Sequence, residues 1–201
     1  MSDKQIKIIL LGESGVGKTN LINAFLGFEF EEMSPSNISS ICYEGKYEYN
    51  NKSYIYTIWD TAGQEKYRSI NKIYIRDAKI ILIVYSIVSR HSFNEIDFWI
   101  NHVKENKSDD EYIMALVANK NDLYEEQMIM DEEGEEAAEK YGFEFLTTSA
   151  LTGAKSFKNF VNKLIACYIQ KFGIQFFDEQ NNNIKINKKN NKEQIKKKNC
   201  C

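Results

Sequence analysis

The sequence contains few residues that interrupt regular structure or cross-link a chain. Of its 201 residues, one is proline (Pro35), ten are glycine and four are cysteine. So few prolines and glycines favour helices and strands joined by few irregular loops. Four cysteines, two of them terminal, do not form the framework of a disulfide-rich secreted domain. With 43% apolar residues, the chain is expected to form one cytoplasmic domain with a full core.

Long apolar segments are also missing. No apolar run reaches the roughly 20 residues that are needed to span a bilayer. The N-terminus does not show the pattern of a signal peptide, and Ser2 excludes N-myristoylation, which requires glycine at that position. We therefore expect neither a membrane-spanning helix nor secretion.

The most informative pattern lies near the N-terminus. Residues 12–19 read GESGVGKT, which matches the phosphate-loop pattern G-x-x-x-x-G-K-[ST], and they follow an apolar, strand-like run over 6–11. Glycines let the backbone N–H groups point at a polyphosphate, Lys18 reaches the β- and γ-phosphates, and the Thr19 hydroxyl ligates Mg²⁺. An ordinary strand-to-helix turn is the competing interpretation, which the strand context disfavours. The predicted nucleotide-binding residues are Glu13, Ser14, Gly15, Val16, Gly17, Lys18, Thr19 and Asn20.

Residues 119–122, Asn-Lys-Asn-Asp, indicate which base is bound. They follow a strand-like run over 112–118, and ligands of open α/β sheets lie at the carboxyl ends of strands. The Asp122 carboxylate can accept hydrogen bonds from guanine N1–H and the 2-amino group, which adenine does not offer in that arrangement. Asn119 can tie the base site to the phosphate loop, and the Lys120 stem can cover one face of the ring. The predicted ligand is therefore GTP or GDP.

A third motif, WDTAGQE at 59–65, closes the apolar strand over 54–58. Asp60 can hold Mg²⁺ through a water, and the N–H of Gly63 can bond the γ-phosphate. Gln64 would orient the attacking water, so it is the predicted catalytic residue.

The phosphate loop, D-T-A-G-Q, N-K-x-D and Thr148-Ser149-Ala150 occur in the order found in Ras-like small GTPases, which the chain resembles over residues 4–172. Further features resemble the Rab branch. The resemblance implies an α/β fold with a mostly parallel six-stranded sheet flanked by helices, slow GTP hydrolysis, and a role in vesicle trafficking. It also implies that the Ala150 N–H meets guanine O6 and that Phe30 packs edge-on against the base. The residues that it adds to the nucleotide site are Phe30, Gly63, Ser149, Ala150 and Leu151.

The last two residues, Cys200 and Cys201, resemble the double geranylgeranylation signal of Rab proteins. Two lipid chains give the stable anchoring that one chain cannot. Residues 181–199 hold seven lysines and one glutamate; since the whole chain carries −3 and this segment +6, the remainder carries −9. We expect a GTPase domain over 1–175 and a flexible tail over 176–201 that attaches it reversibly to the cytosolic face of an intracellular membrane. A solvated tail with two incidental thiols is the alternative.

Three positions depart from the family. Asn37 stands where the family has the threonine that ligates Mg²⁺ only with GTP bound; an amide oxygen can replace it, but its reach differs. Cys42 stands where Rab proteins have the phenylalanine of a Phe–Trp–Tyr cluster that partners read, completed here by Trp59 and Tyr74. Leu151 replaces the lysine that usually follows Ser-Ala. These differences favour a divergent Rab with unusual partners.

The partners that the resemblance implies are an exchange factor, a GTPase-activating protein, effectors, a prenylation escort and a GDP-dissociation inhibitor. No nucleic acid is expected as a partner. With Asn37 in the first switch, a weakly hydrolysing, guanine-nucleotide-dependent membrane adaptor is the alternative function. Retention of Lys18, Thr19, Asp60 and Gln64 favours hydrolysis.

Hydrophobic patterning alternates as a parallel sheet requires. Strands are predicted over 5–11, 41–49, 53–59, 79–86, 112–118 and 144–147, the second and third forming a hairpin. Helices are predicted over 17–26, 68–76, 92–107, 132–141 and 155–172. Ser92 and Glu95 predict a capping box at the start of the third helix.

Overall fold

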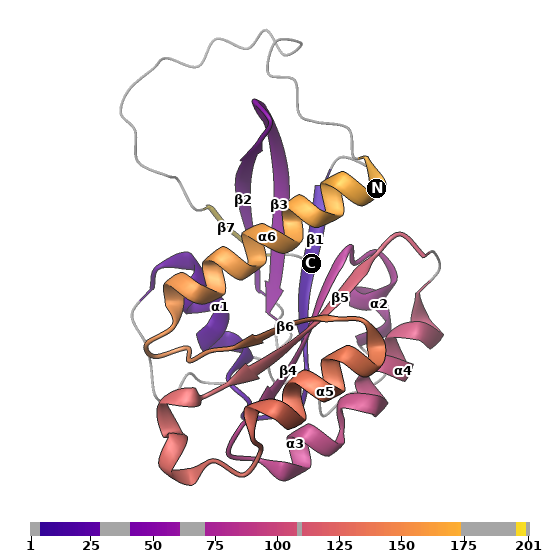
Figure 1. Cartoon of the computed structure of the whole chain (residues 1–201). Helices are drawn as coiled ribbons and strands as arrows, with labels where there is room; N and C mark the ends of the chain where they lie inside the picture. The colour runs from indigo at the N-terminus through magenta and orange to yellow at the C-terminus, as the bar shows by residue number, and fades with distance from the viewer. Residues whose placement is uncertain (1–4, 29–40, 61–70, 108–109, 174–195, 200–201) are drawn as a thin grey trace, which may run out of the picture.

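The computed structural model describes residues 5–28, 41–60, 71–107, 110–173 and 196–199 (Figure 1). Its strands are β1 (Gln5–Leu11), β2 (Ile41–Tyr49), β3 (Lys52–Asp60), β4 (Ile80–Ser86), β5 (Ile113–Asn119), β6 (Glu144–Thr147) and β7 (Lys196–Asn199). They form one sheet in the order β6-β5-β4-β1-β3-β2-β7. The pairs β1–β3, β1–β4, β4–β5 and β5–β6 are parallel. The predicted α/β fold with a mostly parallel sheet is thus confirmed.

β2 accounts for both antiparallel pairings. It forms the predicted hairpin with β3, and the turn residues Asn50 and Asn51 both have positive φ, as a two-residue hairpin turn with the right twist requires. The other edge of β2 pairs with β7, which adds one strand to the six that were predicted. An edge strand presents unpaired N–H and C=O groups, and these accept a further strand whatever its side chains are.

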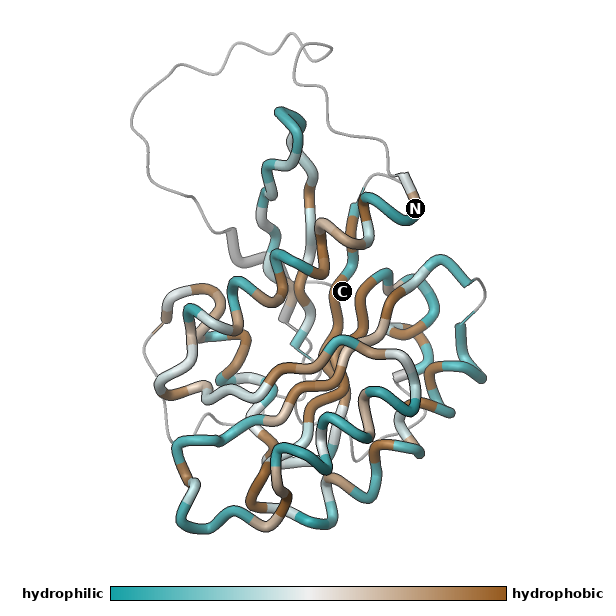
Figure 2. Tube along the Cα trace, viewed as in Figure 1, coloured by the Kyte–Doolittle hydropathy of each residue, from teal (hydrophilic) through white to brown (hydrophobic). Residues whose placement is uncertain are grey.

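The helices are α1 (Lys18–Leu26), α2 (Asn71–Arg76), α3 (Arg90–Asn94), α4 (Ile96–Asn106), α5 (Asp131–Tyr141) and α6 (Ala154–Phe172), with a 3₁₀ helix η1 (Asn121–Glu126). α1 and α6 pack on one face of the sheet, and α2, α4 and α5 pack on the other. The central strands are mostly apolar, because helices cover both of their faces (Figure 2). No helix among the described residues combines the length and apolar character needed to cross a bilayer.

The helix predicted over 92–107 is instead two helices that meet at Glu95. Ser89, not Ser92, is the N-cap, and its hydroxyl accepts a hydrogen bond from the Ser92 N–H at 3.3 Å. The Ser92 hydroxyl is buried and accepts a hydrogen bond from the Ser86 N–H at 3.0 Å, at the end of β4. The predicted capping box at Ser92 was therefore wrong, because this contact with β4 engages the serine inside the helix.

Candidate nucleotide-binding site

The loop between β1 and α1 is shaped by two glycines. At Gly12, where φ is +145°, an added Cβ would lie 2.1 Å from the carbonyl oxygen of Val84. Gly17 is the N-cap of α1 with φ of +95°, and a Cβ there would lie 2.4 Å from Nδ2 of Asn119. No other residue fits at either position without displacing its neighbours. The loop therefore follows one tight path that brings the start of α1 close to β5.

Lys18 is the first residue of α1, and its side chain is only 4% exposed. Its ammonium donates hydrogen bonds to the carbonyl oxygens of Gly12 at 3.0 Å and Glu13 at 2.8 Å. The side chain thus curls back over the loop, and its positive charge lies at the carbonyl oxygens where the loop begins. This arrangement favours a polyphosphate. Thr19 and Asn20 follow in the first turn of α1, both partly buried.

Asn119, at the end of β5, joins three segments that are distant in the sequence. Its side chain is fully buried, and its amide nitrogen donates to the carbonyl oxygen of Val16 at 2.8 Å. Its amide oxygen accepts from the N–H of Ala150 at 3.1 Å. One side chain therefore links the phosphate loop to the loop after β6.

The backbone beyond Asn119 turns sharply. Lys120 has φ of +69°, a conformation uncommon for residues other than glycine, and η1 begins directly after it. The Asn121 N–H donates to the carbonyl oxygen of Thr148 at 3.1 Å. This bond holds the turn against the loop after β6 and places Asp122 in the first turn of η1.

The loop after β6 is fixed by Ser149, which is fully buried. Its hydroxyl accepts hydrogen bonds from the N–H groups of Leu151 at 2.9 Å and Thr152 at 3.2 Å. The Leu151 side chain remains 52% exposed beside this turn. Residues 148–151 therefore form a rigid turn next to the one that carries Asp122.

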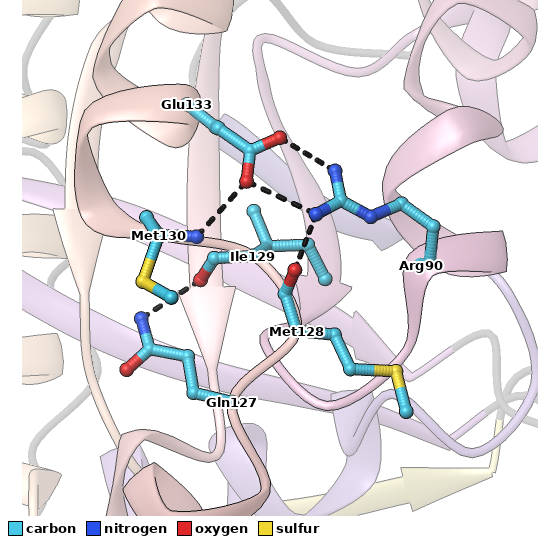
Figure 3. A network of polar contacts seen from close by, with 6 residues as sticks. All are labelled: Arg90, Gln127, Met128, Ile129, Met130 and Glu133. Carbon is cyan, nitrogen blue, oxygen red and sulfur yellow. Dashed lines mark hydrogen bonds and ion pairs between the residues drawn. The ribbon is translucent and has the colours of Figure 1, made fainter.

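A surface network holds the segment after η1 (Figure 3). Arg90 on α3 pairs with Glu133 on α5, with distances of 2.5 and 3.0 Å from its two terminal nitrogens, and also donates to the carbonyl oxygen of Met128. Glu133 accepts from the Met130 N–H at 3.1 Å, which caps α5. The hydrogen bond from Arg90 holds the pKa of Glu133 below its ordinary value. The carbonyl oxygen of Ile87, directly after β4, accepts from the Met128 N–H at 2.9 Å. The chain that leaves the Asp122 turn is thus tied to α3.

The residues predicted to hold Mg²⁺ lie partly in the described structure. Asp60 ends β3 and is 8% exposed. β3 runs parallel to β1, so Asp60 lies at the sheet edge where the phosphate loop begins. Burial raises the pKa of the neighbouring Tyr43, and the negative charge of Asp60 raises it further. The Thr19 hydroxyl and the Asp60 carboxylate are oxygen donors, and a few protein oxygens with phosphate oxygens and waters suit Mg²⁺ in nucleotide sites.

Other predicted residues lie outside the described ranges, and their roles stay predictions. These are Phe30, Asn37, Gly63, Gln64, Cys200 and Cys201.

The three residues of the predicted effector surface lie together. Cys42 is directly opposite Trp59 in the β2–β3 register, and the Trp59 and Tyr74 rings are 5.6 Å apart at 50°. A fourth residue, Lys7, was missed by the sequence analysis: its ammonium lies 4.7 Å from the centroid of the Trp59 ring and 5.5 Å from that of Tyr74. The one available signal was a lysine inside an otherwise apolar strand.

Comparison with known proteins agrees with this geometry. The Ras family model matches residues 7–169. The chain is 41% identical to Ras-related protein Rab-11B of Dictyostelium discoideum over 149 residues, covering 74% of this chain and 67% of that protein. It is 36% identical to Rab2BV of Beta vulgaris (83% and 77% covered) and 34% identical to RABA1b of Arabidopsis thaliana (99% and 94% covered). The chain therefore belongs to the Ras family of small GTPases. Within that family its relatives are Rab proteins, and it is a Rab-type GTPase switch.

Proposed function

We propose that this chain binds GTP and GDP with Mg²⁺, hydrolyses GTP slowly, and acts as a switch in vesicle trafficking. The observation that carries the proposal is the position of Asn119. Its two hydrogen bonds join the phosphate loop to the loop after β6. This contact supports a single site shared by the guanine-type and phosphate-type motifs.

The described residues suggest how the site would act on GTP. The start of α1 and the Lys18 ammonium would bind the phosphates, while Thr19 and Asp60 would hold the metal. Mg²⁺ would neutralise charge that develops on the phosphate oxygens. Gln64 is proposed to orient the attacking water, and Asn37 to contact the metal with GTP bound. Without an activator, turnover on the scale of roughly 10⁻⁴ s⁻¹ is expected.

Base selection is proposed to depend on Asp122. Its turn is held from two sides, by the Asn121–Thr148 bond and by the Arg90 network beyond η1. A carboxylate in a fixed position rejects adenine because it would lose the partners that guanine supplies. The exposed Leu151 would provide an apolar neighbour for the base.

Attachment to a membrane is proposed to use geranylgeranyl groups on Cys200 and Cys201, assisted by the lysines of residues 181–199. The protein would then cycle between cytosol and an intracellular membrane with an escort, a GDP-dissociation inhibitor, an exchange factor, an activator and effectors. The alternative of a weakly hydrolysing adaptor depends on Asn37, outside the described residues, and gains no support from the site.

Single-turnover hydrolysis and nucleotide titration test this function. We expect GTP to be preferred over ATP by at least about 10⁴-fold, because adenine leaves Asp122 unpaired. Asp122→Asn should transfer the preference toward xanthine nucleotides, which is a specific change rather than a general loss. Gln64→Leu should slow hydrolysis by more than about tenfold, because the attacking water is no longer oriented. GTP binding should be kept, because Gln64 does not hold the nucleotide. Equal affinity for ATP and GTP would overturn the proposal.

A further inference from the structure

Lys7 is a cation inside a strand whose neighbours are buried. Ile6 and Ile8, on either side of it, are fully buried. The β1–β3 register pairs Lys7 with Thr57, two residues before Trp59, so that the Lys7 and Trp59 side chains face the same side of the sheet. The cation is therefore built into the sheet at a set position.

Two aromatic rings contact the ammonium of Lys7. The distances to the centroids of Trp59 on β3 and Tyr74 on α2 are 4.7 and 5.5 Å, within the range of a cation–π interaction. A lysine stem of four carbons could instead reach into water, as such side chains usually do. Here the Lys7 ammonium lies against the two rings, so it contributes a positive charge to the surface that Trp59 and Tyr74 form.

The charges that act on Lys7 include one carboxylate, that of Asp77. Burial lowers the pKa of Lys7, and the nearby Asp77 carboxylate opposes this shift. Arg76, however, donates to both carboxylate oxygens of Asp77 at 3.3 Å. Within the described residues Lys7 itself has the two ring contacts but no ion pair. Arg76 and Lys107 add positive charge nearby, although Asp77 has the largest charge effect on Lys7. An incoming carboxylate would supply the ion pair that Lys7 does not form with the described residues.

An exposed apolar side chain is adjacent to Tyr74 in the sequence of α2. Ile73 precedes Tyr74 on α2, and its side chain is 69% exposed. Cys42 is opposite Trp59 but contributes little surface, because it is short and 5% exposed. An occupant of this surface would meet one cation, two rings and one exposed aliphatic side chain.

We propose that Lys7, Trp59, Tyr74 and Ile73 form an acid-reading surface that binds a protein segment carrying an aspartate or glutamate flanked by apolar side chains. The carboxylate contacts the Lys7 ammonium, and the apolar side chains pack on the rings and on Ile73. A charge-assisted bond to a partly desolvated cation is stronger than one at an open surface. The inference rests on the proposed switch function, because this surface is where effectors would read the switch.

The experiment selects helical binders against the full-length chain loaded with a non-hydrolysable GTP analogue. The probe is a displayed three-helix scaffold with one helix face randomised. Binders of the acid-reading surface are identified by loss of binding to Tyr74→Ala. The acidic residue of each such clone is then changed to its amide, and the affinities for wild type, K7M, K7R and K104M are measured. Lys104 is the matched control, because its ammonium also lies over a ring, 5.5 Å from Tyr141, on a different helix.

The proposal predicts that these binders share one acidic position. Its change to the amide should weaken binding to wild type and K104M by about tenfold or more, and binding to K7M by less than about twofold. K7R keeps the charge and should retain the preference even if K7M is destabilised. Three results would overturn the proposal. The binders of this surface share no acidic position, the change of the acid to its amide weakens binding to K7M as much as to wild type, or no binder of this surface is found.

Nucleotide binding is measured separately on the same proteins with fluorescent GTP and GDP. Failure of wild type to bind either would contradict the proposed function. Failure of the acid preference in protein that binds GTP normally would contradict only the role of Lys7.

Discussion

Asn119 makes the most specific prediction about the site. Asn119→Ala removes the donor to the Val16 carbonyl and the acceptor for the Ala150 N–H, which lie 2.8 and 3.1 Å from the amide. All three residues are buried, so neither orphaned group regains a hydrogen bond to water without local opening. Leaving one buried polar group unsatisfied costs about 1–3 kcal/mol, and two such groups predict a loss of about 2–6 kcal/mol.

This loss should appear in two measurements. The free energy of unfolding in urea should fall by about 2–6 kcal/mol, which is roughly 30- to 25,000-fold in the folding equilibrium. GDP release, followed with a fluorescent analogue, should accelerate, because the phosphate and base loops are no longer joined. The refolded fraction must be checked by circular dichroism, so that release is measured on folded protein.

Asn121→Ala is the matched control. Asn121 is two residues further along and exposed, and its contact with Thr148 uses the backbone N–H, which alanine keeps. The control should change stability by less than about 0.5 kcal/mol. If Asn119→Ala is as stable as Asn121→Ala and releases GDP at the same rate, the bridging role assigned to Asn119 is wrong.

Three further predictions concern other parts of the chain. Gly17→Ala should lower GDP affinity at least about tenfold, measured by titration of fluorescent GDP, because its Cβ would meet the Asn119 amide. Gly142→Ala is the control: Gly142 also has positive φ, but its Cβ would enter open space, so GDP affinity should not change. Because its hydrogen bond from Arg90 lowers the pKa of Glu133, this pair should stabilise the fold at neutral pH and lose that effect as the pH falls below about 4.5. Urea unfolding from neutral pH to about pH 3 should show this loss in wild type and a smaller one in Arg90→Met. Replacing both C-terminal cysteines with serine should release the protein from membranes in high salt, because salt screens the attraction of a lysine-rich tail to the membrane. Flotation measures this release, and persistent flotation of the double variant would contradict a lipid anchor.

The parts of the fold that follow from local pattern were predictable. The phosphate loop needs glycines and a lysine at fixed spacing, and the hairpin turn at Asn50 and Asn51 needs residues that tolerate positive φ. Alternating strands and helices then leave few topologies open. The six strands and the main helices follow from these signals alone.

Features that depend on distant contacts were not predictable. The helix after β4 begins at Ser89 because Ser92 is engaged by the backbone of β4, a contact that no helical pattern reveals. Arg90 and Glu133 are 43 residues apart, and each alone looks like an ordinary surface charge. Lys7 was passed over because one lysine hardly changes the hydropathy of an apolar strand.

The Asn119 bridge also has a mechanical consequence for regulation. The loop between β1 and α1 and the loop after β6 share one buried amide, so displacement of either one strains the other. If these loops hold the phosphates and the base as proposed, a regulator that binds at only one end would also weaken the contacts at the other end. Release of the nucleotide would then be a single cooperative opening rather than two independent steps.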